Sequence, residues 1–274
     1  MLRRDDGAHW LVITQPEHAA LSGRLAQAWA VIPAPRAETL LAVYEHDNGH
    51  AETDANGHWN SQTGDVRDFR SAPTETQTAI ARRGVERLAV ESPYAALLVA
   101  IHFGQHAAQE RLLARLRADP ARAADVATER VNAGYQLLQA CDVLSLAVCL
   151  GIERFGSSKD TPAFRPEDQP LLDLTFSHHG GGTVALAPWP FASERVHARI
   201  TARVIPAQRY QSADALAAAF PTPRYGTSRW ILSLTQWRRL PSVSLWRPAG
   251  LRSRRWRRGG PGGNGGSARG GRRG

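Results

Sequence analysis

The chain has 274 residues, a net charge of +9 and two cysteines. A chain of this length can bury a core without disulfides, and Cys141 and Cys149 lie too far apart along one helix to form one. No charged and apolar leader opens the sequence and no run of about 20 apolar residues occurs, so we expect a cytoplasmic protein that makes no contact with membranes.

The positive charge lies at the C-terminal end of the sequence. Residues 237–274 contain eleven arginines and no acidic residue, so this segment carries +11 and residues 1–236 carry −2. Its many glycines and few core-forming residues predict a disordered tail. With Trp246 and Trp256 among the arginines, the tail has a composition that binds RNA or single strands through phosphate contacts and stacking. A dispensable extension or a shifted reading frame is the alternative explanation.

A short strand at 9–14 is predicted to lead into the first helix. Thr14 and Glu17 have the spacing of a capping box, and the apolar residues after them recur at helical spacing. His18 lies three positions before Leu21, on the face that we expect to be buried. The sequence therefore predicts an inward-facing histidine on this helix.

The second helix is predicted to begin after Pro35 and to run to Asp47, with Gly49 ending it in a left-handed cap. Asp47 shares a face with apolar residues of this helix, whereas His46 lies about 100° round it and can approach the same ligand from the helix end. The polar segment 48–72 predicts a long loop, and loops of this length are commonly lids or binding loops.

Two further helices are predicted at about 75–91 and 93–118. His102 and His106 both lie on the second of these. His102 shares a face with apolar residues, so we expect it to point into the core and His106 to lie nearer the surface.

The last long helix is predicted to start at Asp119 and Pro120 and is apolar on every side from 137 to 150. A helix of this kind is buried, and Asp142 is the only charge in its apolar part. Burying an ionised carboxylate costs several kcal/mol unless a cation or hydrogen-bond donors satisfy it. Asp142 therefore needs a partner.

The remaining sequence predicts a small β-rich region at 160–236 that packs on the helical core of 1–150. The fold class is thus mainly α, a helical bundle with a small appended antiparallel β region and the disordered tail 237–274. The elements expected in the β-rich region are strands at 171–176, 183–191, 196–204 and 229–234, and a helix at 213–220. His178 and His179 lie in the hairpin loop between the first two strands, and His197 is expected to face solvent.

Five polar side chains are thus predicted to point inward from successive helices. Imidazole and carboxylate groups that converge in a helical protein are suited to binding a divalent transition metal, here Mn, Fe, Zn or Ni, as one or two ions. The predicted ligands are His18, His46, Asp47, Asp142 and His102. The alternative is that the histidines are hydrogen-bonded core residues and that Asp142 pairs with a buried arginine or caps a helix.

The four positions His18, His46, Asp47 and Asp142 resemble the metal-binding signature of the HD-domain superfamily of helical phosphohydrolases. The local sequence EHDNGH more closely resembles an uncharacterised bacterial domain-of-unknown-function family with an HDNGW-like motif, with His50 in place of the tryptophan. The resemblance covers about 1–220. It implies that the four residues hold the first ion, and that His102 binds a second ion or the substrate phosphate.

The function expected from this resemblance is hydrolysis of a nucleotide or another small phosphorylated substrate by metal-activated water. Asp47, His102 and Asp54 are the candidate catalytic residues, with Glu52 and His50 as further groups in the predicted loop. The sequence contains no glycine-rich phosphate loop and no Gly-x-Ser-x-Gly elbow. The alternatives are a noncatalytic module that binds a metal or ligand, and nucleic-acid binding through the tail 237–274.

Overall fold

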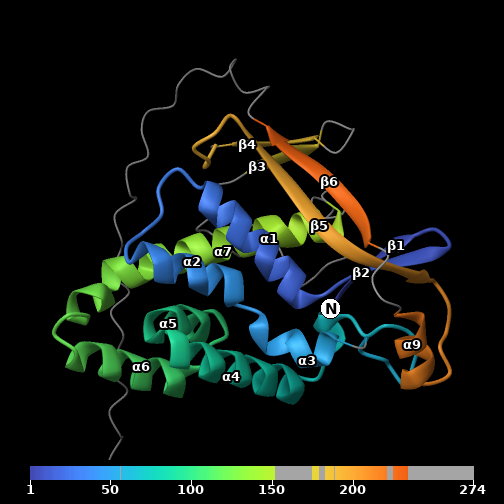
Figure 1. Ribbon diagram of the computed structural model, residues 1–274, viewed down its shortest axis with the longest axis horizontal. Coiled ribbons are helices and arrows are strands. Elements are labelled where there is room, and N and C mark those ends of the chain that lie inside the picture. The colour runs from blue at the N-terminus through green and yellow to red at the C-terminus, as the bar shows by residue number, and fades with distance from the viewer. Residues whose placement is uncertain (56, 152–174, 179–182, 188, 221–224, 234–274) are drawn as a thin grey trace, which may run out of the picture. The chain divides into compact units, whose positions relative to one another are not determined.

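The computed structural model describes residues 1–55, 57–151, 175–178, 183–187, 189–220 and 225–233 (Figure 1). Residues 1–238 form one compact unit, which contains both the helices and the sheet. The predictions for the tail 237–274, and those for His179 and the glycines after it, lie outside the described residues.

The described strands form one sheet in the order β1-β2-β5-β6-β4-β3, in which only the β4 and β6 pair is parallel. Their bounds are β1 Leu2–Asp6, β2 His9–Ile13, β3 Thr175–His178, β4 Thr183–Ala187, β5 Arg195–Pro206 and β6 Tyr225–Ser233. Buried and exposed residues alternate along most of β5, as expected for a strand with one face on the core. His197 is exposed on its outer face, as predicted.

Most of the described helices lie in layers beneath this sheet in the view of Figure 1. Their bounds are α1 Gln15–Ala28, α2 Arg36–Glu45, α3 Ala51–Asp54, α4 Thr74–Glu91, α5 Pro93–His102, α6 His106–Ala118, α7 Thr128–Leu150 and α9 Ala213–Ala219, with 3-10 turns at Asn48–His50, Phe69–Ser71 and Ala123–Val126. α1 and α7 pack against the sheet, α2 packs against α1, α5 packs against α2 and α7, and α4 and α6 contact α5. The prediction of a mainly α protein with a small β part is confirmed.

Local sequence explains where these helices begin. The side chain of Thr14 accepts a hydrogen bond from the backbone N–H of Glu17 at the start of α1, and Ser92 caps α5 in the same way. α7 is long and apolar enough to cross a membrane by length and composition, but 78% of its apolar window is buried inside the protein. It is therefore a core helix, and Asp142 lies within its buried part.

The predicted helix 93–118 is two helices, because the chain turns between His102 and His106. Gly104 has a positive φ of 63°, a conformation that glycine adopts easily and that breaks the helical path. The last helix likewise begins at Thr128 instead of Asp119, after a 3-10 turn. The first break places His102 at a helix end, beside the site described below.

The segment after Asp47 also differs from the prediction. Gly49 does not form a left-handed cap, and the chain continues through a 3-10 turn into α3. A Cβ at Gly49 would overlap the carbonyl oxygen of Ile80, and one at Gly84 would lie 2.8 Å from Oδ1 of Asn48. Gly49 is thus needed for the close approach of this turn to α4. Sequence spacing alone does not reveal this contact.

Candidate metal centre

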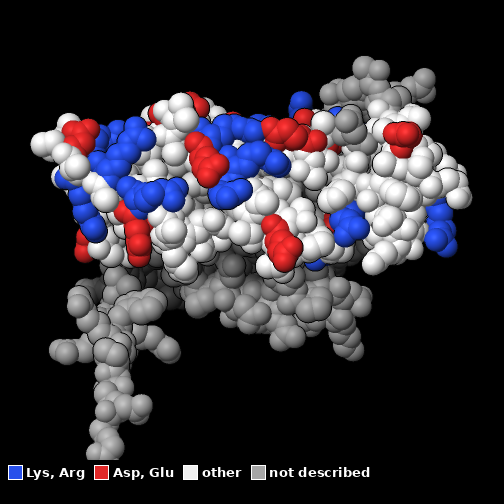
Figure 2. Space-filling model, turned by 90° about the horizontal axis from the view of Figure 1, so that it is seen from below, with Lys and Arg blue, Asp and Glu red and all other residues white. Residues whose placement is uncertain are grey.

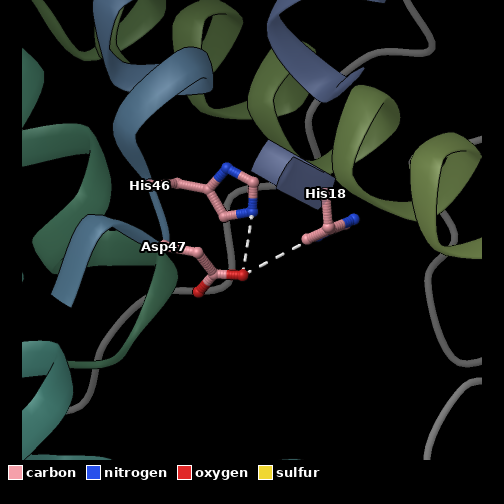
Figure 3. A group of neighbouring side chains, drawn as sticks. All are labelled: His18, His46 and Asp47. Carbon is pink, nitrogen blue, oxygen red and sulfur yellow. Dashed lines mark ion pairs between the residues drawn. The ribbon is translucent and has the colours of Figure 1, made fainter. Parts of the chain in front are cut away.

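Five side chains from four parts of the helical core meet at one place. His18 lies in the first turns of α1, His46 caps the C-terminal end of α2 with Asp47 next to it, His102 is the last residue of α5, and Asp142 lies within α7. Figure 3 shows the side chains of His18, His46 and Asp47 turned toward one another. The predicted ligand set is therefore brought together by the fold, with four of its members buried and His102 partly exposed.

The potential ligand atoms lie close together. Nε2 of His18 is 2.8 Å from Oδ1 of Asp142 and 3.7 Å from Oδ2 of Asp47. Nε2 of His46 is 3.5 Å from one oxygen of each carboxylate, and Nε2 of His102 is 3.7 Å from Oδ2 of Asp142. Two ligand atoms at right angles on an ion, each bound at about 2.1 Å, are about 3 Å apart. These separations therefore fit a shared cation.

Hydrogen bonds fix which nitrogen of two histidines faces this cluster. Nδ1 of His46 lies 2.9 Å from the carbonyl oxygen of Val43, which only accepts, so Nδ1 carries a proton. The hydroxyl of Ser145 lies 2.8 Å from the carbonyl oxygen of Asp142 and 2.7 Å from Nδ1 of His18, which turns Nε2 of His18 toward the cluster. When the His46 ring is neutral, its lone pair is thus on Nε2, the usual arrangement in metal-binding histidines.

The electrostatics of the cluster favour positive charge. Burial acts to raise the pKa of Asp142, but hydrogen bonding to His18 and the nearby His46 hold this pKa well below its ordinary value. Burial acts to lower the pKa of His46, yet the charge of Asp47 and the neighbouring Asp142 raise it to about 9. Burial lowers the pKa of His102. Asp142 is therefore ionised and attracts a proton or a cation.

A cavity of about 190 Å³ opens beside the cluster. Its walls come from α1, the turn after α2, the segment before α4, α4, the end of α5, and α7. The lining residues are Gln15, His18, Asp47, His50, Phe69, Gln77, Ala81, His102, Phe103, Asp142 and Leu146. Ligand-binding pockets are commonly about 300–1,000 Å³, so this one accommodates only a small group.

The structure places the other predicted residues differently. Asp54 is buried but does not line the cavity; it accepts the backbone N–H of Gln15 at 2.7 Å and lies 3.2 Å from the amino nitrogen of Met1. His50 does line the cavity, and burial lowers its pKa. Glu52 is turned outward, where it pairs with arginines of α4. Asp54 is thus positioned to hold the start of α1 and not to contact a ligand.

His106 is exposed at the start of α6 and is not among the residues that line the cavity. On the surface seen from below, basic and acidic side chains alternate, so this face carries no field of a single sign (Figure 2).

Among the described residues Asp142 pairs with histidines and with no arginine, and it lies far from either end of α7. These contacts do not match the alternative that an arginine or a helix end satisfies it.

Sequence reasoning missed two residues of the site. Ser145 follows Asp142 by three positions on α7 and orients His18, and Gln15 precedes His18 by three positions on α1. Both spacings put the residue on the same helix face as a predicted ligand. A search of the i−3 and i+3 positions around each predicted ligand would have found them.

Comparisons with known proteins identify the chain at the family level. Residues 1–207 match a family model described as DUF3891, a protein family of unknown function. This range includes every residue of the site above. No curated protein and no solved structure matches the chain.

Proposed function

The chain belongs to the DUF3891 family, and we propose that it is a metal-dependent phosphohydrolase that cleaves a small phosphoester with the help of one or two divalent transition-metal ions. A bound ion of this kind lowers the pKa of a coordinated water and polarises a phosphoryl oxygen, which is the chemistry that phosphoester hydrolysis needs at neutral pH. His18, His46, Asp47 and Asp142 would hold the first ion.

One contact carries the proposal. Nε2 of His18 and Oδ1 of Asp142 are 2.8 Å apart, and Nδ1 of the same ring is already hydrogen-bonded to Ser145. A ring nitrogen lone pair and a carboxylate oxygen repel each other at this distance unless a proton or cation lies between them. Nε2 of His46, which is buried and has no hydrogen-bond partner among the described residues, points to the same place. A shared cation would satisfy Nε2 of His46 and would replace the hydrogen bond between His18 and Asp142.

The residues around the ion sites have roles that follow from their positions. His102 faces Asp142 from the end of α5, where it can bind a second ion or the phosphoryl group. Because burial keeps the pKa values of His102 and His50 low, both rings are neutral at pH 7 and can accept a proton from water. Phe69 and Phe103 line the cavity and give part of its wall an apolar surface.

The test is metal content together with activity in the full chain. We expect elemental analysis to find one or two transition-metal ions per chain, and Asp47→Ala to lose them while remaining folded. The metal-loaded protein should release inorganic phosphate from at least one member of a panel of phosphomonoesters and nucleotides. No metal in the purified or reconstituted protein would refute the proposal, and bound metal without turnover would favour a noncatalytic metal-binding module.

A further inference from the structure

The outer face of β5 carries a row of basic side chains. Arg195, His197 and Arg199 are exposed, whereas Val196 and Ala198 between them are buried in the core. Outward residues of a strand follow one another at about 6.8 Å, so the three basic side chains are evenly spaced along one line. β5 contains no acidic residue. We call Arg195, His197 and Arg199 the basic row.

A further basic group reaches the same strand from α1, which packs against β5 (Figure 1). The exposed side chain of Arg24 donates from Nη2 to the carbonyl oxygen of Arg199 at 2.8 Å. Among the described strands, residues 195–202 of β5 pair with β6 alone, and pairing with β2 begins only at Arg203. The other edge of β5 is therefore open to Arg24, whose guanidinium lies beside the basic row.

These cations have no anionic partner within the part of the chain that the structure describes. None of the ion pairs found there involves Arg24, Arg195 or Arg199, whereas Arg83 and Arg87 of α4 both pair with Glu52. Like charges held close together repel each other unless an anion neutralises them. Residues 1–236 carry a net charge of −2, so the row is a local concentration of positive charge on a mildly acidic body.

The chain continues from the end of this row into its most basic segment. The register of β5 and β6 pairs Arg195 with Ser233, the last residue of β6. Residues 237–274 follow shortly afterwards and contain eleven arginines, no acidic residue and the three tryptophans Trp237, Trp246 and Trp256. Arginine and glycine with interspersed aromatic residues are typical of segments that bind single-stranded nucleic acids. This segment is thus attached to the chain a few residues after the partner of Arg195.

We propose that the basic row and Arg24 form a binding surface for the phosphate backbone of a single-stranded nucleic acid. This inference does not depend on the proposed function. Guanidinium groups present forked donors that match phosphate oxygens, and the ring of His197 offers a surface on which a base can stack. A positively charged surface that follows the backbone, combined with aromatic rings, is how proteins bind single strands without reading their sequence.

The composition of the face favours this partner over a membrane. The outward residues of β5 from 195 to 203 are Arg, His, Arg, Thr and Arg, so none of them provides the apolar anchor that binding to a lipid surface needs. Arg203 itself is already engaged, because its Nη1 donates to the carbonyl oxygen of Ala55 at 3.0 Å and its guanidinium lies over the ring of Phe220. The proposed surface therefore ends before Arg203.

The experiment measures binding of a fluorescein-labelled oligouridylate to the full chain by fluorescence anisotropy at several salt concentrations. Each phosphate contact of a single strand contributes about −0.7 to the slope of log K against log salt concentration. We therefore expect the double variant Arg195→Gln, Arg199→Gln to have a slope less steep by about 1.4. If both proteins bind equally at 1 M salt, this change weakens binding about 25-fold at 0.1 M. Arg195→Lys with Arg199→Lys keeps both charges and should keep the slope.

Arg111→Gln with Arg117→Gln is the matched control. These two arginines are exposed on α6, on the side of the helical layers away from β5, and the variant loses the same two charges (Figure 1). Because exposed charges more than about 10 Å apart are largely screened at 0.1 M salt, the slope should change by less than about 0.5. Tm should stay the same in every variant, since only exposed side chains are replaced.

The other outcomes overturn the proposal. They are no binding by the parent protein, an unchanged slope in Arg195→Gln, Arg199→Gln, and an equal loss in the control. Equally tight binding of polyglutamate, of phosphatidylserine vesicles or of duplex DNA, with the same dependence on Arg195 and Arg199, would assign the surface to that other partner. All titrations contain a chelator, so their result is independent of the metal site and of any hydrolysis.

Discussion

A bound transition metal should stabilise this protein strongly, and Asp142→Asn should remove that stabilisation. The ligand atoms come from α1, the end of α2, α5 and α7, so an ion would join elements that separate on unfolding. A ligand that binds only the folded state at 1,000 times its Kd adds about 4 kcal/mol to the free energy of unfolding. For a chain of this size, that gain corresponds to a rise in Tm of about 8–16 °C.

The carboxylate of Asp142 is central to this gain, because it lies within 3.7 Å of Nε2 of His18, His46 and His102. Asn keeps the shape of the side chain but removes the negative charge. If the affinity falls a thousandfold, the same metal concentration adds only about 0.4 kcal/mol, and the rise in Tm shrinks to about 1–2 °C.

The assay is thermal unfolding of each protein with a chelator and with an excess of Mn²⁺ or Zn²⁺, so that each variant serves as its own reference. Asp54→Asn is the matched control, since Asp54 is also a buried carboxylate but binds the start of α1 and does not line the cavity. It should lower Tm under both conditions and keep the rise with metal. Equal Tm values with and without metal in the parent, or a full rise in Asp142→Asn, would refute the reasoning.

Three more predictions concern the metal-free chain. Because the pKa of His46 is raised to about 9, its contribution to stability is complete below pH 6.5 and is lost as pH rises through about 9. The pKa of His102 is lowered, so its contribution is lost as pH falls below 6.5; denaturant unfolding in chelator should therefore show a maximum near pH 6.5, and a flat or steadily rising profile would contradict this. Gly49→Ala should lower the free energy of unfolding by about 1–3 kcal/mol in urea, because its Cβ overlaps the backbone of Ile80, and an unchanged midpoint would show that the turn can move. Burial raises the pKa of Cys149, so this thiol should resist alkylation at pH 8 in the folded chain and react only in denaturant, as mass spectrometry can determine.

The sequence by itself determined the parts of the protein that depend on short-range physics. The cap at Thr14 and the apolar periodicity predicted α1 with His18 inward, and the uniformly apolar segment around Asp142 predicted a buried helix with a charge in need of a partner. The mainly α fold followed from such patterns. The resemblance to the HD-domain superfamily and the phosphohydrolase function stay predictions, since none of the comparisons tests them.

Only the tertiary structure decided the features that depend on contacts between distant segments. Asp47 and Asp54 both follow the same helix in an acidic, polar stretch, yet Asp47 lines the cavity whereas Asp54 accepts the backbone N–H of Gln15 at the start of α1. Gly49 is required by the backbone of Ile80, 31 positions away in sequence, and the backbone N–H of Gln15 finds its acceptor in Asp54, 39 positions away. Local sequence encodes the helices and their buried faces, whereas the chemistry of one side chain depends on which other helix lies opposite it.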